Sequence, residues 1–278
     1  MKSMNLIKSL FITLLMVMTI PVSAQEADYN YTFDGQVKWM LLTDAGTLLA
    51  STGEALVGIK PNSSEVSFKI YRLKKVKEEN LEFVPGTPYL IIKPKGMFLH
   101  TSVVDLMNGD MVFDSKEEGW QNGVTSRHFI TPEMKFVVNG AKKGEGAGNY
   151  TSGVGLYDML TGKLVRIFER KPVNAMSGRP DIMGDDIIIP GLKSITCYSI
   201  STGAVKWESD IKNATQIITN EESKEIYAFR TKGNNTVVYK LDAGSGNSLW
   251  PEGNKISGNI ARIEFTDHGL ALVTNIAS

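Results

Sequence analysis

Short runs of alternating apolar and polar residues fill the chain from about residue 30 onward. Four of them lie close together, at residues 185–190, 194–198, 224–229 and 236–239. Runs of this length, bounded by Gly, Pro, Asn or Asp, are typical of half-buried strands. A helical period is much harder to find. Residues 72–80 have room for one turn, but their charge is explained more simply by a solvated connection. The pattern therefore predicts an all-β protein.

One unit of this pattern recurs along the chain. Its clearest copy is YSISTGAVKW at residues 198–207, in which a strand ends at a polar turn closed by glycine and a second strand ends on an aromatic residue. Related copies are LYDMLTGKLVRIF from Leu156, VVDLMNGDMVF from Val103, YKLDAGSGNSLW from Tyr239, FDGQVKW from Phe33 and IKPNSSEVSF from Ile59. Because further short runs precede the turns, each unit is expected to form about four short strands.

The spacing of the turns indicates the fold. The turn position falls, in order, at Gly35, Ser64, Gly109, Gly162, Gly203 and Gly246, with intervals of 29, 45, 53, 41 and 43 residues. Three intervals have the length of a propeller blade, and the interval of 53 fits with one longer loop. Glycine suits the turn because it adopts a positive φ without steric cost. We therefore expect a β-propeller of about six four-stranded repeat units.

An aromatic residue lies four positions after most of these turns. The position holds Trp39, Phe68, Phe113, Trp207 and Trp250. A shared position suggests a shared role, which we expect to be the packing of a large ring against the neighbouring blade. In the remaining copy Phe168 lies six positions after its turn. Because a shift of two keeps a side chain on the same strand face, Phe168 is expected to serve the same role.

The repeated pattern D/S-x-x-T-G-x-x-x-W resembles the PQQ-like (quinoprotein-like) propeller repeat and covers residues 33–278. Residues 199–207 and 158–162 match it best, whereas the unit that ends at Phe68 lacks the turn glycine and departs from it most. The resemblance implies a propeller of PQQ-like four-stranded blades. Proteins of this shape include quinone-dependent alcohol and sugar dehydrogenases, a barrel-assembly lipoprotein of the outer membrane and many other envelope proteins.

For a quinone enzyme, the resemblance implies a tryptophan floor beneath the cofactor, calcium ligands, a catalytic aspartate and, in the alcohol-oxidising branch, adjacent cysteines. The chain has a single cysteine, Cys197, in a run that predicts a small buried hydrophobe. Three of the four tryptophans occupy the repeat position, and the fourth, Trp120, lies in what reads as a polar connection. We therefore expect no cofactor and no catalytic, cofactor-binding or metal-binding residues.

The remaining polar candidates have simpler explanations. Asp105, Asp158 and Asp242 recur where turns start, and there a carboxylate usually caps backbone amides. The three histidines lie in different units without metal-like spacing, at His100, His128 and His268.

One glycine-rich stretch mimics a phosphate-binding pattern. Residues 144–148 read GEGAG, but no helix follows whose N-terminus could hold a phosphate. We interpret residues 140–153 as a flexible loop, which also accounts for the interval of 53. Because propellers place recognition on loops, this is the segment that the sequence favours for binding.

The N-terminus predicts export. Lys2 and Lys8 precede an apolar run at residues 10–20, and Val-Ser-Ala follows at residues 22–24. These features indicate a signal peptide over residues 1–24, which leaves a propeller domain at 25–278. The apolar run of 11 residues is too short to span a membrane, and Gln25 offers no cysteine for a lipid. Without residues 1–24 the chain carries 28 basic and 30 acidic residues, a balance that argues against nucleic acid as a partner.

Two readings of the ring stay open. Residues 25–35 and 246–278 together have the length of one unit, so the ends could share a blade and close a ring of six. In that ring residues 31–39 would pair with residues 270–274. The alternative is truncation at the C-terminus, favoured because the chain stops within a strand pattern and because the interval of 29 is cramped.

The function that these observations favour is that of a non-enzymatic propeller exported to the periplasm or the outside of the cell. It would act as a binding or scaffold module for another envelope or extracellular protein or polymer, without an integral membrane anchor. The alternative is a partial or degenerate PQQ-dependent quinoprotein oxidoreductase, with further residues completing its site.

Overall fold

The computed structural model describes residues 29–93, 100–143, 150–171, 174–266 and 269–275. The signal peptide predicted over residues 1–24 lies outside these ranges, as do residues 144–148 of the glycine-rich stretch and His268. Within them, strands dominate, and the helical segments that are described over their full length are two single 3-10 turns, η1 (Tyr71–Leu73) and η2 (Glu78–Asn80). Neither comes near the length or apolar character that a membrane-crossing helix requires.

The described strands form five four-stranded antiparallel sheets, each a meander in which strands consecutive in sequence are hydrogen-bonded neighbours. Blade 1 contains β1 (Trp39–Leu42), β2 (Leu48–Ser51), β3 (Leu56–Ile59) and β4 (Phe68–Ile70). Blade 2 contains β5 (Leu81–Phe83), β6 (Tyr89–Ile92), β7 (Ser102–Asp105) and β8 (Met111–Asp114). Blade 3 contains β9 (Trp120–Ile130), β10 (Lys135–Lys143), β11 (Tyr150–Asp158) and β12 (Lys163–Glu169).

The pattern continues to the last described residues. Blade 4 contains β13 (Asp181–Met183), β14 (Asp186–Pro190), β15 (Ile195–Ser199) and β16 (Val205–Ser209). Blade 5 contains β17 (Gln216–Asn220), β18 (Glu225–Lys232), β19 (Asn235–Asp242) and β20 (Asn254–Ser257). A two-stranded sheet of β21 (Asn259–Thr266) and β22 (Gly269–Asn275) follows. The prediction of an all-β propeller built from four-stranded repeats is confirmed.

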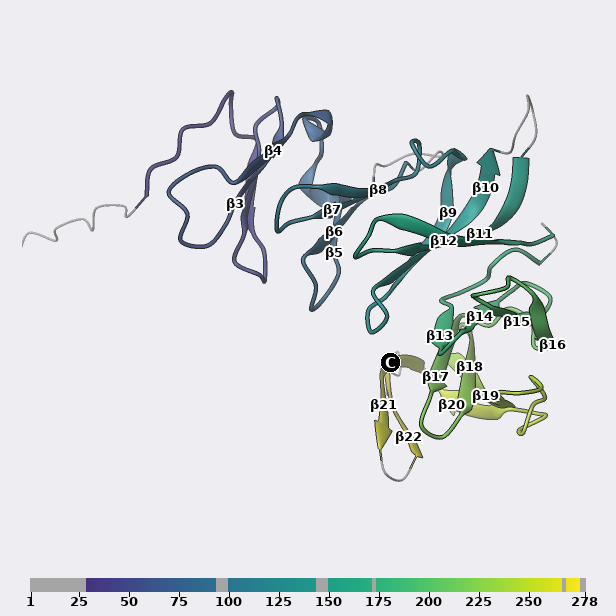
Figure 1. Ribbon diagram of the computed structural model, residues 1–278. Helices are drawn as coiled ribbons and strands as arrows, with labels where there is room; N and C mark the ends of the chain where they lie inside the picture. Colours follow the sequence, from purple (N-terminus) through teal and green to yellow (C-terminus); the bar gives the residue numbers. More distant parts are fainter. Residues whose placement is uncertain (1–28, 94–99, 144–149, 172–173, 267–268, 276–278) are drawn as a thin grey trace, which may run out of the picture.

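The blades follow one another along an arc. Figure 1 shows blades 1 to 3 in a row, while blades 4 and 5 and the β21–β22 pair turn back beneath blade 3. The pairing of residues 31–39 with residues 270–274 is not formed between the described residues, because β1 pairs with β2 and β22 pairs with β21.

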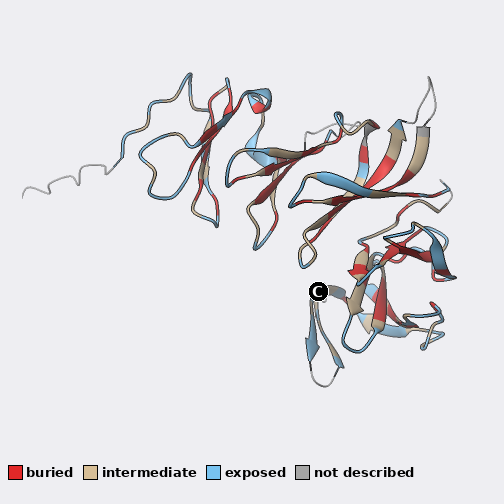
Figure 2. Ribbon diagram, in the orientation of Figure 1, coloured by how far each residue is buried: buried red, intermediate tan, exposed pale blue. Residues whose placement is uncertain are grey.

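The apolar core lies between the blades rather than in one central mass. Separate clusters of buried side chains join blade 1 to 2, 2 to 3, 3 to 4 and 4 to 5. A further cluster joins blade 5 to the β21–β22 pair. Figure 2 shows the buried residues concentrated along the strands of each sheet. Each blade is therefore stabilised mainly by burial of apolar surface against its neighbours in sequence.

The turns between the third and fourth strands of blades 2 to 5 have the predicted conformation. Their glycines, Gly109, Gly162, Gly203 and Gly246, have φ angles between +67° and +80°. The aspartates at the turn starts cap backbone amides, as expected: the carboxylate of Asp242, for example, accepts hydrogen bonds from the backbone N–H and the hydroxyl of Ser245. Asp105 and Asp158 accept equivalent backbone bonds.

The aromatic position four residues after the turn packs on the next blade. The ring of Trp207 covers Gly246, where an added Cβ would lie 2.3 Å from the ring, and its Nε1 donates a hydrogen bond of 2.8 Å to the carbonyl of Ala243. Phe68 covers Gly109 of blade 2 in the same way. Phe113 packs edge-on against Phe136 and Tyr157 of blade 3, and Trp250 adjoins the cluster that joins blade 5 to the β21–β22 pair. The predicted inter-blade role is confirmed for Trp207, Phe68 and Phe113, whereas the ring contact of Trp250 is with Tyr227 of its own blade.

Blade 3 fills the same position with an arginine. Arg166 lies four residues after Gly162 and reaches the turn of blade 4, where its guanidinium donates hydrogen bonds to the carbonyls of Ile200, Ser201 and Thr202. Phe168 is buried and its ring lies 5.1 Å from that of Tyr198. Phe168 thus also contacts blade 4, as predicted, but the contact with the turn itself belongs to Arg166.

The first predicted copy of the repeat is not the end of a blade. Trp39 begins β1, the first strand of blade 1, and its indole Nε1 donates to the carbonyl of Val76 at 3.0 Å. The segment before it runs along blade 1 instead of forming a hairpin there: Tyr31 donates to the carbonyl of Ser63 at 2.6 Å, and Phe33 packs on a cluster of small buried residues. The assignment of Gly35 to the common turn position was therefore wrong.

Trp120 is not in a polar connection. It begins β9, only 2% of its surface is exposed, and its Nε1 donates to the hydroxyl of Tyr157 at 2.8 Å. Gly155 leaves room for the ring, because a Cβ there would lie 2.5 Å from it. The polar residues that precede Trp120 form the turn after β8, whereas the tryptophan side chain itself enters the apolar core.

The expected flexible loop at residues 140–153 is also wrong over its described part. Gly140 pairs with Gly153, and β10 and β11 continue the ladder to the pair Lys143–Tyr150. The interval of 53 residues reflects these long strands.

Candidate binding site on the central axis

The first strands of blades 4 and 5, β13 and β17, lie next to each other. Arg179, just before β13, forms an isolated parallel bridge with Gln216 of β17. The β21 strand contacts β19 of blade 5, and with β17 it lines the second cavity described below. Residues of the first strands β5, β9, β13 and β17 contribute to the lining of two cavities on the central axis of the propeller.

The two cavities adjoin at Arg179. The first axial cavity, of about 290 Å³, lies between blades 2 and 3, and its lining consists of Glu82, Phe83, Val84, Pro85, Ile91, Arg127, His128, Phe129, Thr131 and Arg179. The second axial cavity, of about 400 Å³, lies between blades 3 to 5 and β21, and its lining consists of Ile130, Pro132, Arg179, Asp181, Gln216, Ile217, Ile218, Thr219, Ile260, Ala261, Arg262 and Ile263.

Arg127 is the most buried charge of the first axial cavity. Only 14% of its side chain is exposed, and its nearest acidic partner is Glu82, with 3.7 Å between Nη2 and the carboxylate oxygen. The same oxygen of Glu82 also pairs with Lys93. The Nε of Arg127 is buried and has no hydrogen-bond partner among the described residues. Burial lowers the pKa of Arg127, and the Glu82 carboxylate offsets this in part. This guanidinium is therefore poorly compensated.

His128 follows Arg127 on β9 and is mostly buried in the same cavity. Burial, together with the nearby charges of Arg179 and Arg127, lowers its pKa to about 4. At neutral pH the imidazole is accordingly uncharged and offers one N–H donor and one acceptor nitrogen.

Arg179 lines both cavities. Its backbone N–H donates to Thr215 and its carbonyl accepts from Ile217, which ties it to β17 and the residue before it. Its Nη2 donates to the carbonyl of Phe129 on β9 at 3.1 Å. The guanidinium therefore spans from blade 4 to blade 3 and remains exposed at the junction.

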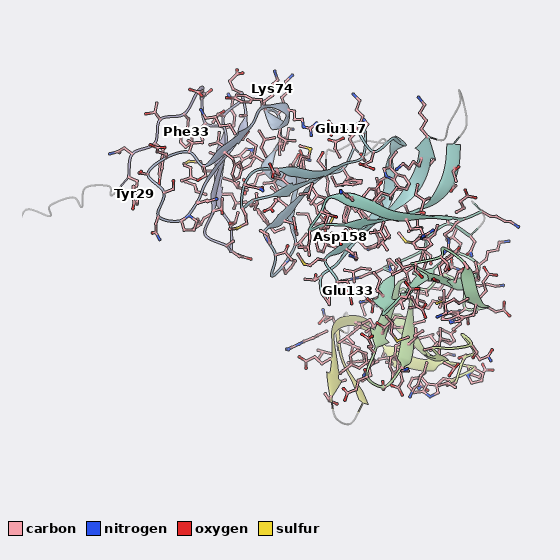
Figure 3. The ribbon with its side chains drawn as sticks, in the orientation of Figure 1. Tyr29, Phe33, Lys74, Glu117, Glu133 and Asp158 are labelled. Atoms are coloured by element: carbon pink, nitrogen blue, oxygen red, sulfur yellow. The ribbon has the colours of Figure 1, made fainter. Side chains whose placement is uncertain are left out.

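The second axial cavity has a different electrostatic character. The carboxylate of Asp181 accepts hydrogen bonds from the backbone N–H of Thr219 at 2.8 Å and from its hydroxyl at 3.0 Å. Burial raises the pKa of Asp181 and also that of Glu133. Figure 3 shows Glu133 on the turn between β9 and β10, on the side of blade 3 that faces blades 4 and 5. At the rim, Arg262 is paired with Glu264. Arg179, which also lines this cavity, interacts electrostatically with Asp181, so the charges here are more closely matched than those of the first axial cavity.

The other residues singled out in the sequence lie elsewhere. Cys197 is buried in β15, as predicted, and burial raises the pKa of its thiol to about 12, so it carries no reactive thiolate at neutral pH. His100 is exposed in blade 2, away from the axial cavities. The sequence analysis missed Arg127 and Arg179, because they are far apart in the chain and only the curvature of the arc brings them to one cavity.

Comparisons with known proteins concern the architecture alone. No protein-family model matches the sequence, and no curated protein matches it. Among solved structures, BamB from Moraxella catarrhalis aligns with a TM-score of 0.44 and 15% identity, over 84% of this chain and 68% of that chain. Hsv2 from Kluyvelomyces marxianus aligns with a TM-score of 0.42 and 12% identity, over 88% of this chain and 71% of that chain. Likenesses of this size say nothing about function, so the function is argued from the chain's own residues.

Proposed function

We propose that residues 1–24 are a signal peptide and that residues 25–278 form an exported propeller domain, which acts without catalysis as a binding or scaffold module in the cell envelope. The observation that carries the proposal is the axial site, where four blades and β21 contribute side chains to two adjoining cavities. Because strands rather than loops form most of these walls, the surface is largely preformed, which lowers the entropic cost of docking a partner.

The alternative of a partial quinoprotein oxidoreductase has less support. Trp120 is buried within blade 3, and Trp207 is engaged with the turn of blade 5, so neither is free to form a floor for a cofactor. Nowhere in the described ranges do three or more His, Cys, Asp or Glu side chains gather as a metal site would require. Both observations favour recognition over redox chemistry.

Site-specific photo-crosslinking tests the proposal. The crosslinking residue p-benzoylphenylalanine is placed at Ala261, an exposed lining residue of the second axial cavity, and in a matched variant at Val205, which is exposed on the outer strand β16. In the cells that produce the protein, the Ala261 variant should give one discrete protein or polymer adduct in the envelope fraction, and the Val205 variant should not. The absence of an adduct from Ala261, or equal adducts from both positions, would count against an axial binding function.

Calorimetric titration separates the two functions. Addition of PQQ and of Ca²⁺ to the purified chain should give no saturable heat, because the described residues offer neither a tryptophan floor nor a calcium ligand set. A micromolar or tighter dissociation constant for PQQ would favour the oxidoreductase instead.

A further inference from the structure

We propose that the first axial cavity is a binding pocket for a small carboxylate that carries an apolar side chain, with Arg127 and Arg179 as its carboxylate-binding residues. This goes beyond the proposed function, since it concerns the chemistry of one small ligand and holds whether or not a larger partner docks on the axis.

An uncompensated positive charge is the first reason. Arg127 and Arg179 both line the cavity, and the only acidic residue there, Glu82, is already shared with Lys93 outside it. Even when Asp181, which interacts with Arg179 from the second axial cavity, is included, three cations meet two carboxylates. Buried charges in proteins are normally paired, because an isolated ion loses its hydration without compensation. The cavity lining thus favours an anionic ligand.

The placement of the two guanidiniums is the second reason. Arg127 extends from β9. Arg179 precedes the first strand of blade 4 and is fixed by its hydrogen bond to the carbonyl of Phe129. Phe129 is only two residues from Arg127, so both guanidiniums lie at the same short stretch of β9. Arginine binds carboxylates with paired N–H donors and with fixed geometry.

The remaining walls define the rest of the ligand. Phe83, Val84, Pro85 and Ile91 from blade 2 and Phe129 from blade 3 give the cavity an apolar side. A volume of about 290 Å³ is small for a ligand site, and it suits a single amino-acid-sized group rather than a polymer. The neutral imidazole of His128 adds a hydrogen-bonding group without adding charge. A ligand with a carboxylate next to a medium-sized apolar group matches the apolar side, the volume and the hydrogen-bonding group of the cavity.

Two sources share this chemistry, namely a free small carboxylate and the C-terminus of a peptide chain. The probes are therefore 4-methylpentanoate and acetyl-alanyl-leucine, and the neutral control is acetyl-alanyl-leucine amide. Binding is measured by calorimetry on the full chain at low salt. We expect saturable binding of a carboxylate probe and at least tenfold weaker binding of the amide. Comparable affinities for both carboxylates would show that a free small acid is sufficient for binding. A tenfold preference for the peptide would show that the pocket binds the C-terminus of a chain.

Arginine variants assign the site. Arg179→Gln, at an exposed position, and Arg127→Gln should each weaken binding of the better carboxylate at least tenfold, which corresponds to about 1.4 kcal/mol. Arg262→Gln is the matched control, because it removes the same charge from the same axial surface but lines the second cavity and is paired with Glu264. Thermal melts identify any variant that fails to fold. If the buried Arg127→Gln variant fails to fold, the affinity of the Arg179→Gln variant alone tests the proposal.

Three results would overturn the proposal. The first is the absence of saturable binding by both carboxylates, and the second is equal affinity for the peptide and its amide. The third is an Arg262→Gln variant that loses as much affinity as Arg179→Gln, since that would reduce the effect to general surface charge.

Discussion

The contact from blade 4 to blade 5 and the contact from blade 3 to blade 4 use the same position of the repeat with opposite chemistry. Trp207 covers Gly246 with an aromatic ring and donates its single side-chain N–H to one carbonyl. Arg166 approaches Gly203 with a guanidinium and bonds to three carbonyls of that turn. Both side chains lie four residues after the turn glycine of their own blade.

The difference shows that the receiving turn offers two kinds of surface. A glycine at positive φ leaves a flat patch without a side chain, which a ring can cover. The same turn directs carbonyl groups outward, and a planar set of N–H donors can bind them. The position in the repeat therefore determines that blades touch there, while the residue type determines whether the contact is mainly apolar burial or mainly hydrogen bonding.

Trp207→Ala should lower the free energy of unfolding by about 3 to 5 kcal/mol, because it removes a large ring from a buried contact and leaves a cavity. Val205→Ala on the same strand is the control, and since Val205 is 55% exposed its effect should stay within about 0.5 kcal/mol. Urea denaturation measures both. Equal losses would show that Trp207 does not hold the blades together.

Gly246→Ala should cost about 2 to 4 kcal/mol, since the new methyl group requires a positive φ and also collides with the Trp207 ring at 2.3 Å. Gly203→Ala should cost only about 1 to 2 kcal/mol, because its nearest neighbour at 3.0 Å is the end of the flexible Arg166 side chain. Chemical denaturation of the two variants in parallel gives the difference. A larger loss for Gly203→Ala would reverse the contrast between the two contacts.

Arg166→Ala should destabilise the fold by about 1 to 2 kcal/mol, less than Trp207→Ala, because the three hydrogen bonds are partly exposed to water and compete with it. The double variant with Trp207→Ala tests independence. The two losses should add to within about 0.5 kcal/mol if the contacts belong to separate interfaces.

Arg166→Lys should cost less than about 1 kcal/mol, since an ammonium retains the charge and can bond to some of the three carbonyls but cannot match the planar guanidinium. The free energies of unfolding of the Lys and Ala variants are compared. A Lys variant as unstable as the Ala variant would mean that guanidinium geometry, rather than charge, accounts for the whole contact.

Much of the architecture follows from the sequence because the repeat has local causes. Glycine is needed wherever a hairpin requires a positive φ, and the position four residues later is needed wherever a fourth strand meets the next blade, so spacing alone located both. The role of Arg166 is not apparent from the pattern, because the repeat position is marked by aromatic rings and an arginine that contacts the same turn has no aromatic signature. Phe168 was identified correctly as an inter-blade ring but not as a neighbour of that arginine.

The errors at Trp39 and Trp120 have one physical origin. A short motif shows which residues surround a tryptophan in sequence, but burial depends on which strands surround it in space. Trp120 has polar neighbours along the chain and the apolar groups of blade 3 around its ring. The candidate site could not be predicted for the same reason, since Arg127 and Arg179 come together only where blades 3 and 4 adjoin.

The partition of the core into clusters that each join two consecutive sheets has a consequence for cooperativity. When each unit exchanges most of its stabilising contacts with its immediate neighbours, the free energy of unfolding behaves approximately as a sum of unit terms and nearest-neighbour coupling terms. When the contact between two blades is weakened, the segments on its two sides open separately. Amide exchange would then accelerate on one side of the weakened contact and not on the other. The side chain at the fourth position after each turn thus influences how far a local opening spreads through the protein.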